Sequence, residues 1–288
     1  MKYLVITVAA VLLLVTGSLI IAGFRWKDKS RKLLEGLERA AEVPESGFYR
    51  PQMLEGLPEP VQRYFRTVLE PGVLLLTGAR VLHRGTFNMA EEGSNWKAFS
   101  SEQRVSVYPP GFLWDARISI LPGLDARVHD GYIDGEGLLK ASLGGLIPLV
   151  ELEGPGEIAR GELMRWLAEA AWYPTALLPG RNLHWEAVDG TSARAVLQDG
   201  GIGLSLLFRF TDEGLIDSVW SDGRERMVAG GTERTPWEGR WSNYQWREGM
   251  LIPLSGEVLW RLSGGEKPYW RGEITEIEYE YADTGSAP

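Results

Sequence analysis

The chain has 288 residues, 44% of them apolar and 24% charged, which is the composition of a folded protein with a sizeable core. It contains no cysteine, so disulfides, thiolate metal sites and a cysteine nucleophile are excluded. Residues 1–32 hold six basic and one acidic side chain, which leaves residues 33–288 with 24 basic and 38 acidic, a net charge of about −14 that disfavours nucleic acid as a partner.

The amino-terminal end is a long uncharged run. No side chain from Tyr3 to Phe24 is charged, and this length matches the roughly 20 apolar residues that cross a bilayer as a helix. The run is longer than the apolar core of a cleaved signal peptide, and Trp26 follows where an interfacial aromatic residue belongs. We therefore expect a single-pass protein of the cell membrane, with the bilayer as the partner of Tyr3 to Phe24.

Basic residues follow this run and favour a cytoplasmic domain by the positive-inside rule. Residues 1–32 are thus predicted to form the anchor and a basic juxtamembrane segment that suits anionic head groups. Residues 33–54 read as a helical stalk or linker, which Pro44 breaks. Within residues 58–72 a second helix is predicted, with one apolar face made by Val61, Tyr64, Phe65 and Val68.

From Val73 onward the apolar period changes to two, which is typical of strands. Two early strands have one filled face each: Val81, His83, Gly85 and Phe87, then Phe112, Trp114, Ala116, Ile118 and Ile120. A later hairpin is predicted to point Leu204, Leu206, Phe208 and Phe210 inward and to return with Ile216 and Trp220. The spacing of the turns indicates antiparallel hairpins.

One helical stretch separates the two strand-rich halves of the sequence. Its spacing places Leu163, Leu167 and Ala170 on one face and Glu162, Arg165, Glu169 and Trp172 on the other. Because Arg165 and Glu169 are one turn apart, we expect an ion pair between them, with Trp172 stacked on the arginine.

Signatures of catalysis are absent from the sequence. His83, His129 and His184 are not spaced as zinc ligands, and no nucleophile elbow occurs. We therefore predict no metal site, no cofactor and no catalytic residue. Glu169 and Asp115 lie beside tryptophans, and a carboxyl group with a pKa raised by such a neighbour could act as a general acid in a hydrolase, which remains an alternative.

The economical architecture is α+β and mainly β: one curved, half-barrel-like antiparallel sheet covered by a few helices and preceded by one transmembrane helix. We expect a single mainly-β domain over residues 55–282 and a disordered tail over residues 283–288.

Several stretches resemble a bacterial family of domains of unknown function that usually follow one membrane span. The most specific are the R-x-x-x-E-x-x-W-x-P helix end at Arg165 to Pro174 and a W-x-x-Y hairpin, with Trp241 and Tyr244, that ends at Pro253. The likeness covers about residues 55–281, and the family carries no established activity.

The order of elements is also similar to that of the lipoprotein carriers and lipid-binding proteins of bacterial envelopes. That similarity implies a half barrel with a helical lid and an acyl chain between them, and it implies an extracytoplasmic domain, against the charge rule.

Three functions follow as hypotheses. The first is a membrane-anchored module that binds a lipid or a lipoprotein acyl chain, and the others are a carboxylate hydrolase and a structural or scaffolding domain. For the binding module, the candidate ligand and lid residues are Arg165, Glu169, Trp172, Trp114, Trp241 and Tyr244.

Overall fold

The computed structural model describes residues 1–42, 47–228 and 230–282, so the tail predicted over residues 283–288 lies outside the described residues. The helices, including three short 3-10 helices, are α1 (Lys2–Ala40), η1 (Pro51–Leu54), α2 (Glu59–Val68), α3 (Glu157–Glu169), η2 (Ala170–Trp172) and η3 (Pro174–Leu177). The strands are β1 (Leu76–Asn88), β2 (Trp96–Ser106), β3 (Gly111–Leu121), β4 (Leu124–Ile133), β5 (Glu136–Leu143), β6 (Ile147–Gly154), β7 (Leu183–Ala187), β8 (Ser192–Asp199), β9 (Ile202–Phe210), β10 (Ile216–Val228), β11 (Gly231–Arg247), β12 (Met250–Leu262) and β13 (Gly265–Tyr281).

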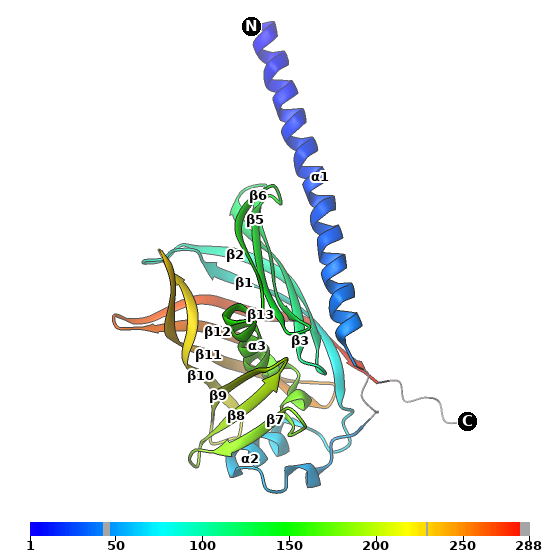
Figure 1. Ribbon diagram of the computed structural model, residues 1–288, viewed down its shortest axis with the longest axis vertical. Coiled ribbons are helices and arrows are strands. Elements are labelled where there is room, and N and C mark those ends of the chain that lie inside the picture. The colour runs from blue at the N-terminus through cyan, green and yellow to red at the C-terminus, as the bar shows by residue number, and fades with distance from the viewer. Residues whose placement is uncertain (43–46, 229, 283–288) are drawn as a thin grey trace, which may run out of the picture.

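All the described strands belong to one open antiparallel sheet, which confirms the predicted mainly-β architecture. Its order is β6-β5-β4-β3-β2-β1-β13-β12-β11-β10-β9-β8-β7. The chain therefore enters at the centre with β1, runs out to one edge at β6, crosses to the opposite edge at β7 and returns to pair β13 with β1. In Figure 1 this sheet curves strongly around α3.

Helix α3 and the two short helices after it make the crossing between the edges. Helix α3 contacts strands of both halves of the sheet, β3 to β6 on one side and β9 and β10 on the other. The halves also meet at one end, where the Tyr132 hydroxyl donates to Asp199 at 2.8 Å. Helix α3 is consequently enclosed on both faces, and its predicted polar face is buried as well: Glu162 is 4% exposed and Glu169 8%.

Helix α2 packs on β12 and β8 and follows the sequence prediction closely. Its predicted apolar face is fully buried, namely Val61, Tyr64, Phe65 and Val68. Prolines at its first positions supply a fixed φ suited to a helix start.

Helix α1 contacts β2, β3 and β4, on the face of the sheet opposite α3. Only its carboxyl-terminal half makes these contacts, because every described side chain from Met1 to Thr16 is exposed. Figure 1 shows the amino-terminal half extending away from the sheet. The side chains of residues 8, 11, 12 and 15 are outside the description. Among the described residues, no helix is both long and apolar enough to cross a membrane, so the predicted span is not confirmed.

Trp26 is 8% exposed and stacks on His129 of β4, and its expected place at a membrane interface stays a prediction. One sequence prediction about side-chain direction was wrong. Trp220, expected to point inward with Ile216, is only half-buried and lies on the outer face, where Arg209 and Arg261 stack on it. A register shift between Ile216 and Ser218 inserts one residue, so the inward position passes to the next residue along.

Candidate functional site

A buried charge network centred on Arg165 joins α3 to the concave face of the sheet. The guanidinium donates to Glu169 Oε1 at 2.7 Å and to Asp130 Oδ2 at 2.6 Å. Its third contact is Gln103 Oε1 at 3.3 Å, and the amide of Gln103 donates to the other oxygen of Glu169 at 2.8 Å. The predicted pair between Arg165 and Glu169 is thus present, as part of a closed ring of three side chains with Gln103, to which Asp130 is attached through Arg165.

The surroundings of Arg165 explain how a buried cation is tolerated here. Burial favours the neutral form of Arg165, but the carboxylates of Glu169 and Asp130 outweigh it and raise the arginine's pKa, so the cation persists. Its guanidinium also lies 4.9 Å from the ring centre of Phe112 and 5.0 Å from that of Trp114. Planar guanidinium groups suit such stacking together with forked hydrogen bonds.

A second buried pair, Glu162 with Arg224 at 3.3 Å, adjoins this ring. Burial and the nearby Asp130 carboxylate raise the pKa of Glu162 well above its usual range. Within the described residues, Glu162 Oε2 and Asp130 Oδ1 are buried without a hydrogen-bond partner. The raised pKa favours the protonated, neutral form of Glu162, which relieves its repulsion from the Asp130 carboxylate.

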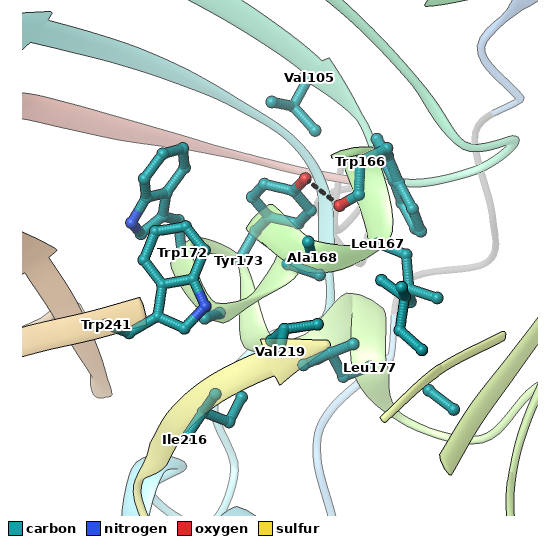
Figure 2. Close-up of a cluster of buried hydrophobic side chains, with 14 of the residues drawn as sticks. Val105, Trp166, Leu167, Ala168, Trp172, Tyr173, Leu177, Ile216, Val219 and Trp241 are labelled. Atoms are coloured by element: carbon teal, nitrogen blue, oxygen red, sulfur yellow. Dashed lines mark hydrogen bonds between the residues drawn. The ribbon is translucent and has the colours of Figure 1, made fainter. Parts of the chain in front are cut away.

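An aromatic cluster lies beside the charge network, under η2. Trp172 packs edge-on against Trp241 with ring centres 5.1 Å apart, and His83 lies 4.9 Å from Trp172. Trp270 contacts both Trp172 and His83, at 6.3 Å each. Figure 2 shows Trp172 and Trp241 side by side at the edge of the core around Tyr173, whose hydroxyl donates to Trp166 O at 2.7 Å.

The polar atoms of this cluster are mostly unpaired. In the part of the chain that the structure describes, the indole N–H groups of Trp172 and Trp241 are buried without a hydrogen-bond acceptor, and Nε2 of His83 is buried without a hydrogen-bond partner. Burial, together with Arg165, lowers the pKa of His83 to about 3, so its ring is neutral near neutral pH. The cluster therefore offers buried hydrogen-bond donors within an apolar surface.

Glycines in the sheet make room for the indoles. A Cβ at Gly256 would approach Trp241 Cζ3 to 2.6 Å, and one at Gly272 would overlap the ring of Trp270. Real Cβ atoms do not approach other atoms so closely. Because these positions lack a side chain, Trp241 and Trp270 lie flat on the concave face.

Beyond α3 the concave face carries an aromatic strip, made of Phe87, Trp237, Trp260 and Tyr269. Tyr269 stacks on Trp260 at 5.5 Å, contacts Phe87 at 5.9 Å and accepts the Trp237 N–H at 2.9 Å. Trp237 also lies 5.4 Å below the guanidinium of Arg224, which ties the strip to the charge network and places it on the α3 side of the sheet. Phe87, Trp260 and Tyr269 are only half-buried. In Figure 1 the β12–β13 hairpin that carries two of them extends beyond α3.

The predicted site residues thus fall into three places. Arg165, Glu169 and Trp114 meet in the charge network. Trp172 and Trp241 meet in the aromatic cluster, so the arginine stacks on Phe112 and Trp114 and the predicted Trp172 stack was wrong. Tyr244 is held elsewhere, with its hydroxyl donating to Ile216 O at 2.7 Å beside Tyr64 of α2.

Sequence reasoning missed most of the network partners. They are Gln103, Asp130, Glu162 and Arg224, with His83 and Trp270 in the aromatic cluster. Gln103 shares its period-two face with Phe99 and Val105, and this polar residue on a face that points inward is the one local signal that was available. Asp130, Arg224, His83 and Trp270 are brought to α3 and η2 by the curvature of the sheet, whereas Glu162 is on α3 itself.

A third polar cluster lies on the opposite face, under α1. Ser30 Oγ donates to Asp115 Oδ2 at 2.6 Å and lies 2.7 Å from His129 Nε2, while the indole of Trp26 donates to Asp115 Oδ1 at 3.2 Å. In a catalytic relay the acid and the hydroxyl bind opposite ring nitrogens. Here both lie at Nε2, since Asp115 Oδ2 is 3.5 Å from it. The cluster is therefore a latch that fastens α1 to the sheet.

The latch also bears on the hydrolase alternative. Burial opposes ionisation of Asp115, but the hydrogen bonds from His129 and Ser30 leave the pKa of its carboxyl below the ordinary value. A general acid needs the opposite shift. Across residues 1–42, 47–228 and 230–282, no group of three or more His, Asp or Glu side chains is placed to hold a metal ion.

These features define a class: an open antiparallel sheet wrapped around a crossing helix, with a buried charge network and an aromatic concave face. The chain belongs to a family of unknown function, DUF6920, whose model matches residues 55–279. No curated protein matches it.

Solved structures that are similar to the chain include the following two. A LolA superfamily protein from Nitrosomonas europaea is 10% identical, with 76% of this chain and 91% of that chain covered and a TM-score of 0.33. A beta-barrel-like protein from Brucella abortus, of the domain of unknown function DUF1849, is 13% identical, with 72% and 99% covered and a TM-score of 0.19.

Proposed function

We propose that the chain is a membrane-anchored module that binds an apolar ligand, a lipid or a lipoprotein acyl chain, along its concave face. The observation that carries the proposal is the aromatic strip. Phe87, Trp260 and Tyr269 are packed against one another yet remain partly open to solvent at the end of a buried core. Apolar surface in a concave setting is where proteins hold apolar ligands.

The neighbouring groups suit an acyl ligand with an ester or amide. Trp172 and Trp241 bring buried N–H donors without acceptors, and a carbonyl oxygen is the acceptor such a ligand carries. In the charge network, by contrast, the charged side chains pair with one another. It serves in this proposal to hold α3 against the sheet, so that Arg165 and Glu169 brace the lid and take no part in a reaction.

Anchoring is the second part of the proposal, and it is supported by the sequence together with the position of α1. The run from Tyr3 to Phe24 carries no charge. Its described side chains up to Thr16 are all exposed, and the domain offers them no surface to pack on. A lipid bilayer would cover these apolar side chains.

Ligand binding is tested on the full chain in mild detergent by titrating a fluorescent fatty acid and following energy transfer from tryptophan. Trp260→Ala should weaken binding several-fold, because it removes half of the stacked pair in the strip. The matched control is Trp246→Ala, since Trp246 is 50% exposed at the β11–β12 turn. Equal affinity for the two variants, or no saturable binding by the parent chain, would overturn the proposal.

Anchoring is tested separately by expressing the full chain in bacteria and washing the membranes with alkaline carbonate. The proposal predicts that the chain stays in the membrane pellet. Release of the chain into the wash would refute the anchor while leaving the binding result untouched.

A further inference from the structure

The turns at one end of the sheet expose a group of large apolar side chains. Leu121 lies at the β3–β4 turn and is 60% exposed, while Leu146, Ile147 and Leu149 of the β5–β6 hairpin are 48%, 58% and 52% exposed. We call these four residues the tip patch. Strand β6 is also an edge of the sheet, with unpaired backbone groups on its outer side. Such an edge is usually protected by charge or by a partner.

The tip patch is placed next to α1. An ideal Cβ at Gly144 would lie 3.0 Å from Leu19 Cδ2, and one at Gly145 would lie 3.5 Å from Ala22 Cβ. The β5–β6 turn therefore rests against residues 19–22 of the helix. Figure 1 shows this hairpin reaching alongside α1, just below the half of the helix that leaves the domain.

This contact fixes the depth of the tip patch relative to the uncharged run. The run ends at Phe24, and the turn lies against the helix up to five residues earlier, at Leu19. At a rise of 1.5 Å per residue, the turn lies up to about 8 Å inside the end of the run. Apolar groups that bind a membrane surface are buried by roughly 5–10 Å. If residues 3–24 are in the bilayer, the tip patch is at the depth of its head-group and acyl boundary.

Charges near the turn are arranged as this depth requires. Arg25, Lys27 and Lys29 follow the run at once, and the guanidinium of Arg127 reaches within 3.5 Å of a Cβ built at Gly23. Arg117 is the strand partner of Arg127. Basic side chains at this level suit anionic head groups.

Acidic side chains in the same region are mostly paired or set back. Asp28 is paired with Arg31 and Lys32, and Glu153 of β6 with Lys140. Asp125 and Glu151 remain beside the patch, and the basic residues at this level outnumber them. The local balance is therefore positive, although residues 33–288 as a whole are acidic.

We infer that the tip patch is a membrane-binding surface: Leu121, Leu146, Ile147 and Leu149 enter the interface of the same leaflet that α1 enters, and the domain is held against the bilayer at two places. The inference rests on the proposed anchoring. It adds a lipid contact from the folded domain itself.

Because the chain has no cysteine, a single introduced cysteine reports one position. Ile147→Cys, Leu13→Cys and Val188→Cys full-length chains are labelled with an environment-sensitive dye and reconstituted in vesicles of phosphatidylethanolamine and phosphatidylglycerol. Nitroxide lipids labelled near the head-group end of the acyl chain quench a dye at that depth, and lipids labelled near the methyl end quench a dye at the bilayer centre, where Leu13 is expected because it lies about 16 Å inside the end of the run. Val188 is the matched control, since it is 49% exposed in the β7–β8 turn at the far end of the sheet.

The inference predicts at least twofold stronger quenching at position 147 than at position 188, with a blue-shifted emission at position 147. Quenching at position 13, with position 147 behaving like position 188, would overturn the inference and leave the anchor intact. No quenching at either position 13 or position 147 would overturn the anchor and the inference together. Circular dichroism of each labelled chain confirms that the label has not disturbed the fold.

Discussion

At the scale of single residues, Arg165 is the most consequential side chain. Its guanidinium holds Glu169, Asp130 and Gln103 from three different elements. Only 13% of its side chain is exposed, so its partners cannot turn to water when it is removed. A buried ion pair adds little stability compared with apolar packing. Removing one partner, however, leaves the other charge buried without a counter-charge.

Replacing Arg165 by methionine should therefore lower the free energy of unfolding by about 3–5 kcal/mol. Arg84→Met is the control: its pair with Glu273 is made by side chains 71% and 59% exposed, and such a surface pair contributes about 1 kcal/mol at most. Urea unfolding of the full-length variants in the same detergent measures both. Similar losses for the two variants would show that the network does not brace the lid.

Glu162 should impose a pH dependence on stability. Its pKa is raised in the folded chain by burial and by Asp130, whereas an unfolded glutamate titrates near about 4.3. Between these two pKa values the folded chain keeps a proton that the unfolded chain has lost. The stabilisation is thus complete below the unfolded pKa and is lost as the pH rises toward the folded one, by up to about 1.4 kcal/mol per pH unit.

Glu162→Gln mimics the protonated carboxyl and cannot titrate, so this decline should be missing from the variant. Urea unfolding of both proteins from about pH 5 to about pH 8 gives the comparison. Parallel pH profiles would contradict a raised pKa of Glu162 in the folded chain.

At the scale of elements, the concave strands combine glycine and tryptophan. Gly272 and Gly256 leave space that the indoles of Trp270 and Trp241 fill. Elsewhere an alanine in place of a strand glycine is neutral or slightly stabilising, because glycine loses more backbone entropy on folding. At these two positions the added methyl group would collide with a ring.

We predict that Gly272→Ala destabilises the fold by about 1–3 kcal/mol through overpacking and reduces the near-ultraviolet circular dichroism of the tryptophans. Gly203→Ala in β9 is the control, since nothing lies within 4 Å of its added Cβ. The account of the aromatic cluster fails if the two alanine variants unfold alike.

The sequence predicted elements better than it predicted partners. Period-two patterns located the strands, and the apolar face of α2 was correct because that helix packs on one side only. Helix α3 differed, since a curved sheet encloses it and buries Glu162 and Glu169 along with its apolar face. The bulge near Ser218 turned Trp220 outward, and one inserted residue has no signature in apolar periodicity.

At the scale of the whole molecule, the two faces of the sheet have different tasks. The inner face holds α3, the charge network and the aromatic cluster, and the outer face holds the latch to α1. Asp115 and His129 of the latch come from adjacent strands, while Trp26 and Ser30 are one turn apart on α1. The latch thereby sets the direction in which the apolar half of α1 leaves the domain.

Trp26→Ala should loosen α1 without unfolding the sheet, because it removes the stack on His129 and the hydrogen bond to Asp115. Hydrogen exchange should then accelerate at least tenfold over residues 25–40, with little change in β8 to β13. Phe24→Ala is the control, since Phe24 is 69% exposed. Unchanged exchange in residues 25–40 would show that Trp26 does not hold the helix.

The central claim, that an acyl chain lies on the concave face, is tested most directly by photo-crosslinking. The full chain in detergent is incubated with a fatty acid that carries a diazirine, irradiated, digested and mapped by mass spectrometry. The account predicts crosslinks in β1, β12 and β13, at peptides that contain Phe87, Trp260 or Tyr269, and their loss when unlabelled fatty acid competes. Crosslinks confined to α1 and the tip patch would show that lipid meets only the membrane-facing surface, and would contradict a ligand site within the sheet.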